Sequence, residues 1–193
     1  LSGSLPRLDA PDSAGVGPLE PGMGPREMMR AKGIDTFGKS SYKLHNVHFL
    51  IENPYDEALL YASAKGDLEV VKVLLNHPPI DVNVQDEEGN TPLMYACRYG
   101  RVEIIEYLLT HPSLNLSLRH KVGWTPLMFA AMSGRLSAVK LILEHSSNTS
   151  LDLNAQCDKG WSVLCWASHG GLIRVVKYLL SRYPTSININ ASS

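Results

Sequence analysis

This sequence of 193 residues has almost no excess of positive or negative charge, few aromatic residues and no long apolar run. Lys and Arg number 18 against 19 Asp and Glu, so the formal net charge is -1. Proteins that neutralise nucleic-acid phosphates usually carry a clear basic excess, so we expect no nucleic-acid partner. No apolar run approaches the roughly 18 residues that cross a bilayer, so we expect no membrane insertion. The chain fits a soluble globular class with few aromatic anchors.

Cysteine is equally sparse. The three cysteines, Cys97, Cys157 and Cys165, form an odd number without the spacing of a disulfide framework. This favours a reducing compartment, so we expect the protein in the cytoplasm, with the nucleus left open. No cysteine pairs with a histidine in a catalytic pattern, and we expect no enzyme activity, no metal site and no cofactor.

The first 52 residues differ in composition from the rest. Residues 1–25 hold five Pro and five Gly, which is typical of a tail or linker. Residues 26–52 are mixed and include the apolar stretch 47–51, a candidate cap for the domain that follows. Residues Gly33–Ser40 match the phosphate-binding pattern G-x-x-x-x-G-K-[ST], but neither a buried strand before it nor a nucleotide-binding sheet after it is predicted. We interpret the match as coincidence and keep a nucleotide-binding enzyme as an alternative.

From residue 53 onward the sequence repeats itself. The anchors are Glu57-Ala-Leu-Leu60, Thr91-Pro-Leu-Met94, Thr125-Pro-Leu-Met128 and Ser162-Val-Leu-Cys165. A glycine follows each anchor by nine residues, as Gly66, Gly100, Gly134 and Gly171. A second apolar block and an Asx-rich phrase complete each unit. We therefore predict four repeats at residues 57–90, 91–124, 125–161 and 162–193, with a longer loop near residues 146–150 in the third.

One unit predicts two helices. Thr91, Thr125 and Ser162 can cap a first helix, and Pro92 and Pro126 suit its first position because the missing N–H costs nothing there. The glycine supplies a left-handed turn into a second helix, which His-Pro pairs then end. A single unit cannot bury both apolar faces, so stability depends on stacking.

These features together resemble the ankyrin repeat over about residues 53–193. The carriers of the resemblance are Thr-Pro-Leu-x-x-Ala, the glycine nine residues on, Val-Val-Lys-x-Leu-Leu, Asp-Val-Asn and Asp-x-x-Gly. Tetratricopeptide repeats share the 34-residue period but lack the turn phrase and the proline start. The family's usual His after Thr-Pro-Leu is Met94, Met128 and Cys165 here. The resemblance implies an all-α solenoid of antiparallel helix pairs with protruding β-turn or hairpin loops.

The resemblance also implies a non-catalytic scaffold that binds a protein or peptide on the concave surface of turns and first helices. Carried over by position, the expected contact residues are Glu87, Glu88, Asn90, Arg98, Tyr99, Lys121, Trp124, Met132, Lys159, Trp161 and His169. Trp124 and Trp161 are expected on adjacent turns as the main anchors, because Trp often dominates interfaces. The alternative is that each indole lies on its neighbouring turn and supports the stack. Two further options stay open: the N-terminal segment docks on this surface, or the domain is a regulatory arm of an enzyme whose catalytic domain is absent.

The recurring histidines, the distribution of charge and the composition of the last helix each give one further expectation. His77, His111 and His145 recur at one repeat position, but packed helices lie 8–10 Å apart, so we expect helix-end caps rather than a shared metal. Residues 53–118 carry a net charge of -6 and residues 119–193 a net charge of +5, an electric dipole along the stack. The final second helix is apolar for a terminal repeat, so we expect further repeats or another chain to cover that end.

Overall fold

The chain is described here by a computed structural model that covers residues 54–76, 80–145 and 151–188. Within those ranges it forms eight helices and no strand. In chain order the helices are α2 (Pro54–Lys65), α3 (Leu68–Leu75), α4 (Pro92–Arg98), α5 (Val102–Leu109), α6 (Pro126–Met132), α7 (Leu136–His145), α8 (Val163–His169) and α9 (Ile173–Arg182).

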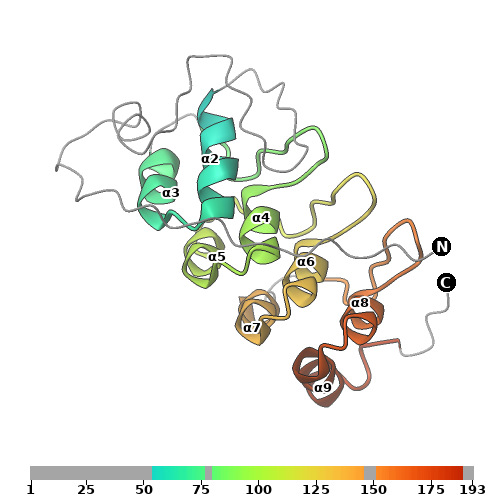
Figure 1. Cartoon of the computed structure of the whole chain (residues 1–193). Helices are drawn as coiled ribbons and strands as arrows, with labels where there is room; N and C mark the ends of the chain where they lie inside the picture. Colours follow the sequence, from blue (N-terminus) through green and yellow to red (C-terminus); the bar gives the residue numbers. More distant parts are fainter. Residues whose placement is uncertain (1–53, 77–79, 146–150, 189–193) are drawn as a thin grey trace.

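The helices stack as pairs in two rows. Figure 1 shows the first helices α2, α4, α6 and α8 in one row and the second helices α3, α5, α7 and α9 in the other. Each helix contacts its pair mate and its counterpart in the next pair. The loops between pairs project beyond the row of first helices (Figure 1). The predicted all-α solenoid is therefore confirmed.

The predicted helix starts are confirmed as well. The Thr91 and Thr125 hydroxyls accept the backbone N–H three residues on, at 3.2 and 3.3 Å, and Ser162 does the same at 3.4 Å. Pro92 and Pro126 occupy the beginning of α4 and α6. Each cap satisfies a donor that the helix itself leaves unpaired, which typically stabilises a helix by about 1 kcal/mol.

The glycines between paired helices have the backbone that the sequence predicts. Their φ angles are 95° at Gly66, 63° at Gly100, 70° at Gly134 and 65° at Gly171. This left-handed region is open to glycine at little cost and strains other L-residues. The turn lets each second helix fold back against the first within two or three residues.

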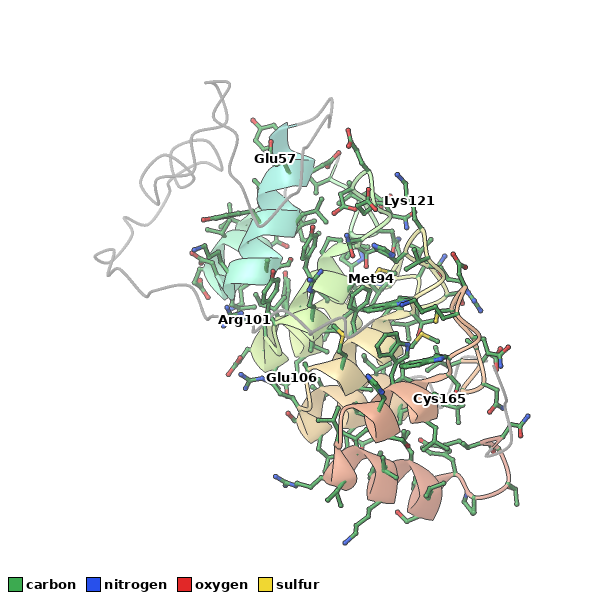
Figure 2. All side chains as sticks on the ribbon, turned by 45° about the vertical axis from the view of Figure 1, so that its right-hand side comes forward. Glu57, Met94, Arg101, Glu106, Lys121 and Cys165 are labelled. Atoms are coloured by element: carbon green, nitrogen blue, oxygen red, sulfur yellow. The ribbon has the colours of Figure 1, made fainter. Side chains whose placement is uncertain are left out.

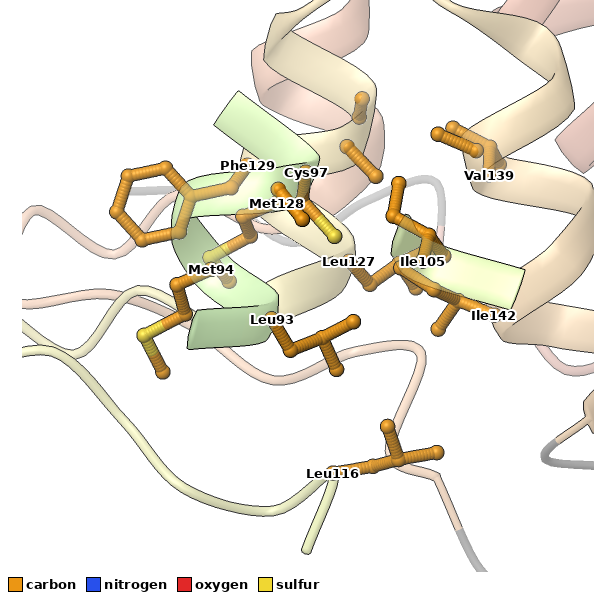
Figure 3. Packing of buried hydrophobic residues seen from close by; sticks show 14 of the residues in the cluster. Leu93, Met94, Cys97, Ile105, Leu116, Leu127, Met128, Phe129, Val139 and Ile142 are labelled. Carbon is orange, nitrogen blue, oxygen red and sulfur yellow. The ribbon is translucent and has the colours of Figure 1, made fainter. Parts of the chain in front are cut away.

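One apolar core runs through all four pairs. Ala96, Ala130 and Ala167 are fully buried, and these small side chains let neighbouring first helices approach closely. Met94 and Met128 are buried too, so apolar packing occupies the position of the family's usual histidine. Figure 3 shows side chains of α4 to α7 meeting in this core; those labelled include Leu93, Cys97, Ile105, Leu127, Val139 and Ile142.

Candidate functional site

Three turns project from the stack, at residues 85–90, 119–124 and 156–161. In each turn a backbone N–H donates to the carbonyl four residues later, at 3.0 to 3.1 Å. The donors are Asp86, His120 and Cys157, and the acceptors are Asn90, Trp124 and Trp161. Each turn is therefore closed on itself, with the residue just before the next helix fixed at its base.

Neighbouring turns are also bonded to each other. The Lys121 N–H donates to the Glu88 carbonyl at 2.9 Å, and the Asp158 N–H donates to the Val122 carbonyl at 3.1 Å. At Gly123, where φ is 78°, an added Cβ would lie 3.0 Å from the backbone of the following turn, so glycine allows this close approach without strain. Figure 2 shows Lys121 at the outer edge of the turns, across the molecule from Arg101. The turns thus hold their side chains at fixed intervals.

Six rings from the last two turns and first helices form a continuous cluster, which we call the aromatic row. Its members are His120, Trp124, Phe129, Trp161, Trp166 and His169. Trp166 lies at its centre, with ring centroids 4.6 Å from Trp124 and 4.7 Å from Trp161. Trp124 contacts Phe129 at 5.1 Å, and Trp161 contacts His169 at 4.9 Å. Such tilted and edge-to-face pairs each add about 0.5–1.5 kcal/mol beyond area burial.

Burial divides the aromatic row into a base and an outer edge. Phe129 and Trp166 are buried, with exposed fractions of 2% and 9%, whereas Trp124 and Trp161 are half-buried. Both half-buried indoles also pack against the main core. They therefore support the stack and still present part of each ring to solvent. Trp124 and Trp161, which we expected on adjacent turns, are connected by Trp166, whose ring contacts both.

Sequence reasoning missed Trp166, Phe129 and His120 as members of the site. The sequence held a signal for two of them, because the residue directly after each four-residue anchor is aromatic. These residues are Tyr61, Tyr95, Phe129 and Trp166. The pattern predicts a stacked column beneath the turns. The burial of that column could not be derived from spacing alone, because it depends on how far the preceding turn folds over it.

The first turn is organised around the buried carboxylate of Asp86. It accepts hydrogen bonds from the backbone N–H groups of Glu88 at 3.0 Å and Asn90 at 2.8 Å, and from the Tyr95 hydroxyl at 2.7 Å. The Asn90 side-chain amide donates to the same carboxylate at 3.0 Å. Burial, and then the hydrogen bond that its hydroxyl donates to Asp86, raise the pKa of Tyr95. Asn90 is buried and its amide is used within the turn, so Glu87 and Glu88 form the exposed surface here.

Apart from Asn90 and the two indoles, the predicted contact residues differ in exposure, and His169 among them belongs to the aromatic row itself. Half-buried are Arg98, Tyr99 and Met132, and exposed are Glu87, Glu88, Lys121, Lys159 and His169. The Arg98 guanidinium lies 5.9 Å from the centroid of the Tyr99 ring. The exposed ion pair of Lys121 with Glu88, at 3.6 Å, contributes little to stability.

His120 belongs to the aromatic row and also interacts electrostatically with nearby charged side chains. Its Nδ1 accepts the Val122 N–H at 3.2 Å, and its ring contacts Trp124 and Phe129. Burial lowers the pKa of His120; the charges of Glu88 and Asp86 oppose that shift, while Arg98 and Lys121 add to it. The imidazole therefore favours its neutral form in the folded turn.

Other candidate sites have less support. Within the described ranges, no group of three His, Cys, Asp or Glu side chains is placed to hold a metal ion. His77 and the segment Gly33–Ser40 lie outside the described residues. His111 Nδ1 accepts the Ser113 N–H at 3.4 Å, so it braces the loop after α5. No helix in the described ranges combines the length and apolarity that a membrane span needs.

Stacked helix pairs joined by hydrogen-bonded turns define a helical repeat protein that displays one row of turn side chains. The family model described as ankyrin repeats (3 copies) matches residues 39–120 and 111–192, and the chain belongs to that family. Ankyrin repeats generally mediate protein–protein interaction and are typically non-catalytic. Among curated proteins, none matches the chain.

Proposed function

We propose that this chain is a non-catalytic scaffold that binds a protein or peptide partner on its turns and first helices. The observation that carries the proposal is the outer edge of the aromatic row, formed by Trp124 and Trp161. Large, partly exposed aromatic side chains on a rigid base lose little conformational entropy on binding, and Trp is enriched at interface hot spots. His169 contacts Trp161. Arg98, Tyr99 and Met132 are the further contact residues of the proposal, with the exposed Glu87, Glu88, Lys121 and Lys159 as its polar rim.

The test compares three baits in affinity purification: the wild-type chain, the double variant Trp124→Ala/Trp161→Ala, and the control Tyr107→Ala. Tyr107 is also a half-buried aromatic residue, but it lies on α5 in the other row of helices. We expect a partner retained by the wild type and Tyr107→Ala and lost with the double variant. A loss of about 2 kcal/mol or more in direct binding is expected for a hot-spot pair.

The purified partner is then titrated while tryptophan fluorescence is followed. The chain has three tryptophans, all in the aromatic row, so the emission reports on this surface directly. A partner that all three baits retain equally, with no change in emission, would place the contact elsewhere. Thermal melting of each bait separates lost contacts from lost folding.

The N-terminal segment is proposed as a competitor for the same surface. Its proline-rich composition suits docking on aromatic rings. Deleting residues 1–45 should then tighten partner binding without lowering the melting temperature. A lower melting temperature would instead assign the segment a capping role. For cellular location we propose the cytoplasm, because three unpaired cysteines suit a reducing compartment.

A further inference from the structure

The second helices share a pair of apolar positions that face the next repeat. In α5 these positions are Ile105 and Leu109, with exposed fractions of 0% and 5%. In α7 they are Val139 and Leu143, with 0% and 3%. Helix α7 packs against α5, and α9 packs against α7. From this packing and their burial we infer that the two positions lie in the contacts between pairs. Each established interface therefore uses the same two positions.

Helix α9 presents the same two positions without a covering helix among the described residues. They hold Val176, which is half-buried, and Leu180, which is 38% exposed. Ile173, on the same face at spacing i, i+3, i+7, is 65% exposed. Ile173 and Leu180 are two of the three large hydrophobic residues that are exposed within the described ranges. The apolar positions of the repeating interface are thus present in α9, and no described residue covers them.

The first helix of the last pair, α8, likewise has an exposed residue at a position that is buried in α4 and α6. Cys97 in α4 and Ala131 in α6 are fully buried against the next first helix, whereas the equivalent Ser168 in α8 is exposed. Its side chain is as small as theirs, so it allows another helix to approach closely. We call the surface formed by Ser168, Ile173, Val176 and Leu180 the end face.

Charge indicates what kind of helix the end face accepts. Helix α9 carries Arg174, Lys177 and Arg182 and no acidic residue. The position of Arg174 holds Glu69, Glu103 and Ser137 in the other second helices, so its positive charge is particular to α9, whereas the position of Lys177 is Glu only in α5. Two end faces brought together would place like charges opposite each other, which costs free energy. An acidic helix would be attracted instead.

We propose that the end face binds an amphipathic helix of a partner protein that has an apolar stripe flanked by acidic residues. The partner helix packs on Val176 and Leu180 as α9 packs on Val139 and Leu143. Its carboxylates lie beside Arg174 and Lys177. This surface is separate from the aromatic row, so it does not depend on the proposed function.

The probe is a fluorescein-labelled, hydrocarbon-stapled helical peptide with the α5 sequence Val102–Leu109, which contains Glu103 and Glu106. A second peptide carries Lys at both glutamate positions. Fluorescence anisotropy measures binding of each to the full 193-residue chain. We expect the acidic peptide to bind at least tenfold more tightly than the basic one, with an affinity that falls as salt rises.

Three protein variants test the assignment. Leu180→Glu should weaken the acidic peptide at least tenfold, and Arg174→Glu/Lys177→Glu should reverse the preference between the peptides. Val122→Glu is the matched control, because Val122 is a 43% exposed apolar residue on a projecting turn. It should leave peptide binding unchanged.

Several outcomes would overturn the proposal. One is equal binding of the acidic and basic peptides, and another is acidic-peptide binding that survives the charge reversal. A third is self-association of the unliganded chain in sedimentation velocity that Leu180→Glu abolishes, since a second copy would then be the occupant. Arg174 and Lys177 are exposed, so the charge-reversal variant keeps the test decisive if Leu180→Glu does not fold.

Discussion

The side-chain amide of Asn83 pairs with the backbone around Asn115 in the next repeat. Its Oδ1 accepts the Asn115 N–H at 2.8 Å, and its Nδ2 donates to the Ser113 carbonyl at 2.7 Å. Asn154 makes the same pair of bonds one junction further on, to the Ser186 carbonyl at 2.7 Å and the Asn188 N–H at 2.6 Å. An asparagine amide carries its donor and its acceptor on separate atoms, so it can bond an N–H and a carbonyl of one stretch of backbone at the same time. It ties adjacent loops together without a strand.

Replacing Asn83 by Ala should lower the free energy of unfolding by about 1–2 kcal/mol, since two hydrogen bonds of about 1 kcal/mol each are lost at a partly hydrated site. Urea denaturation measures the change. The control is Ser117→Ala at the equivalent position of the next repeat, where we expect less than about 0.5 kcal/mol. Equal effects from the two substitutions would contradict a specific role for the amide.

Trp166 offers a test of how the aromatic row is supported. Trp166→Ala should destabilise the chain by about 3–5 kcal/mol, because it leaves a cavity beneath Trp124 and Trp161. Trp166→Phe should cost much less, about 1.5 kcal/mol or below, since the buried indole Nε1 has no hydrogen-bond partner among the described residues. Thermal and urea denaturation measure both variants. A Phe variant as unstable as the Ala variant would contradict the expectation that a smaller ring can support Trp124 and Trp161.

Most of the fold could be predicted from the sequence because each feature has a local cause. Thr91 and Thr125 cap, Pro92 and Pro126 begin helices, and Gly100 turns left-handed, all within a few residues of chain. Two such helices leave an apolar face that only a neighbouring repeat can bury. The period of the sequence repeat therefore predicts a stack of helix pairs.

The candidate site was predicted less completely because it depends on contacts between repeats. Trp124 and Trp166 are far apart in the sequence, and their contact depends on how the last two pairs stack. The resemblance implied that Asn90 is a contact residue, but Asn90 is buried and its amide donates to the Asp86 carboxylate. Which polar side chain in a turn faces solvent is decided by such partners, and residue type does not reveal them.

The cysteines should differ sharply in reactivity. Burial raises the pKa of the Cys97 thiol well above its usual range, so its thiolate is scarce at neutral pH and no reagent reaches it. Cys157 is also buried, whereas Cys165 is half-buried. Under native conditions iodoacetamide should modify Cys165 first and Cys97 only after unfolding. Peptide mass spectrometry against time checks this order, with the Cys97→Ala variant as the control for assignment. Modification of Cys97 at the rate of Cys165 would mean that α4 opens readily.

His120 should make the turn at residues 119–124 sensitive to mild acid. Its folded-state pKa lies below the ordinary value of 6.5, with burial as the main cause, so the unfolded chain binds this proton first as the pH falls. The stability that the neutral ring provides is complete above pH 6.5 and is lost as the pH falls toward the lower, folded-state pKa.

The variant His120→Asn keeps a side-chain oxygen that can accept the Val122 N–H, and this side chain cannot be protonated. Its free energy of unfolding should therefore fall less than that of the wild type between pH 7 and pH 5. Urea denaturation at several pH values measures this difference, and an NMR titration of the imidazole gives the pKa directly. The other histidines are present in both proteins and cancel in the comparison. A titration midpoint for His120 at or above 6.5, or parallel pH profiles for the two proteins, would contradict the desolvated, neutral ring at this turn.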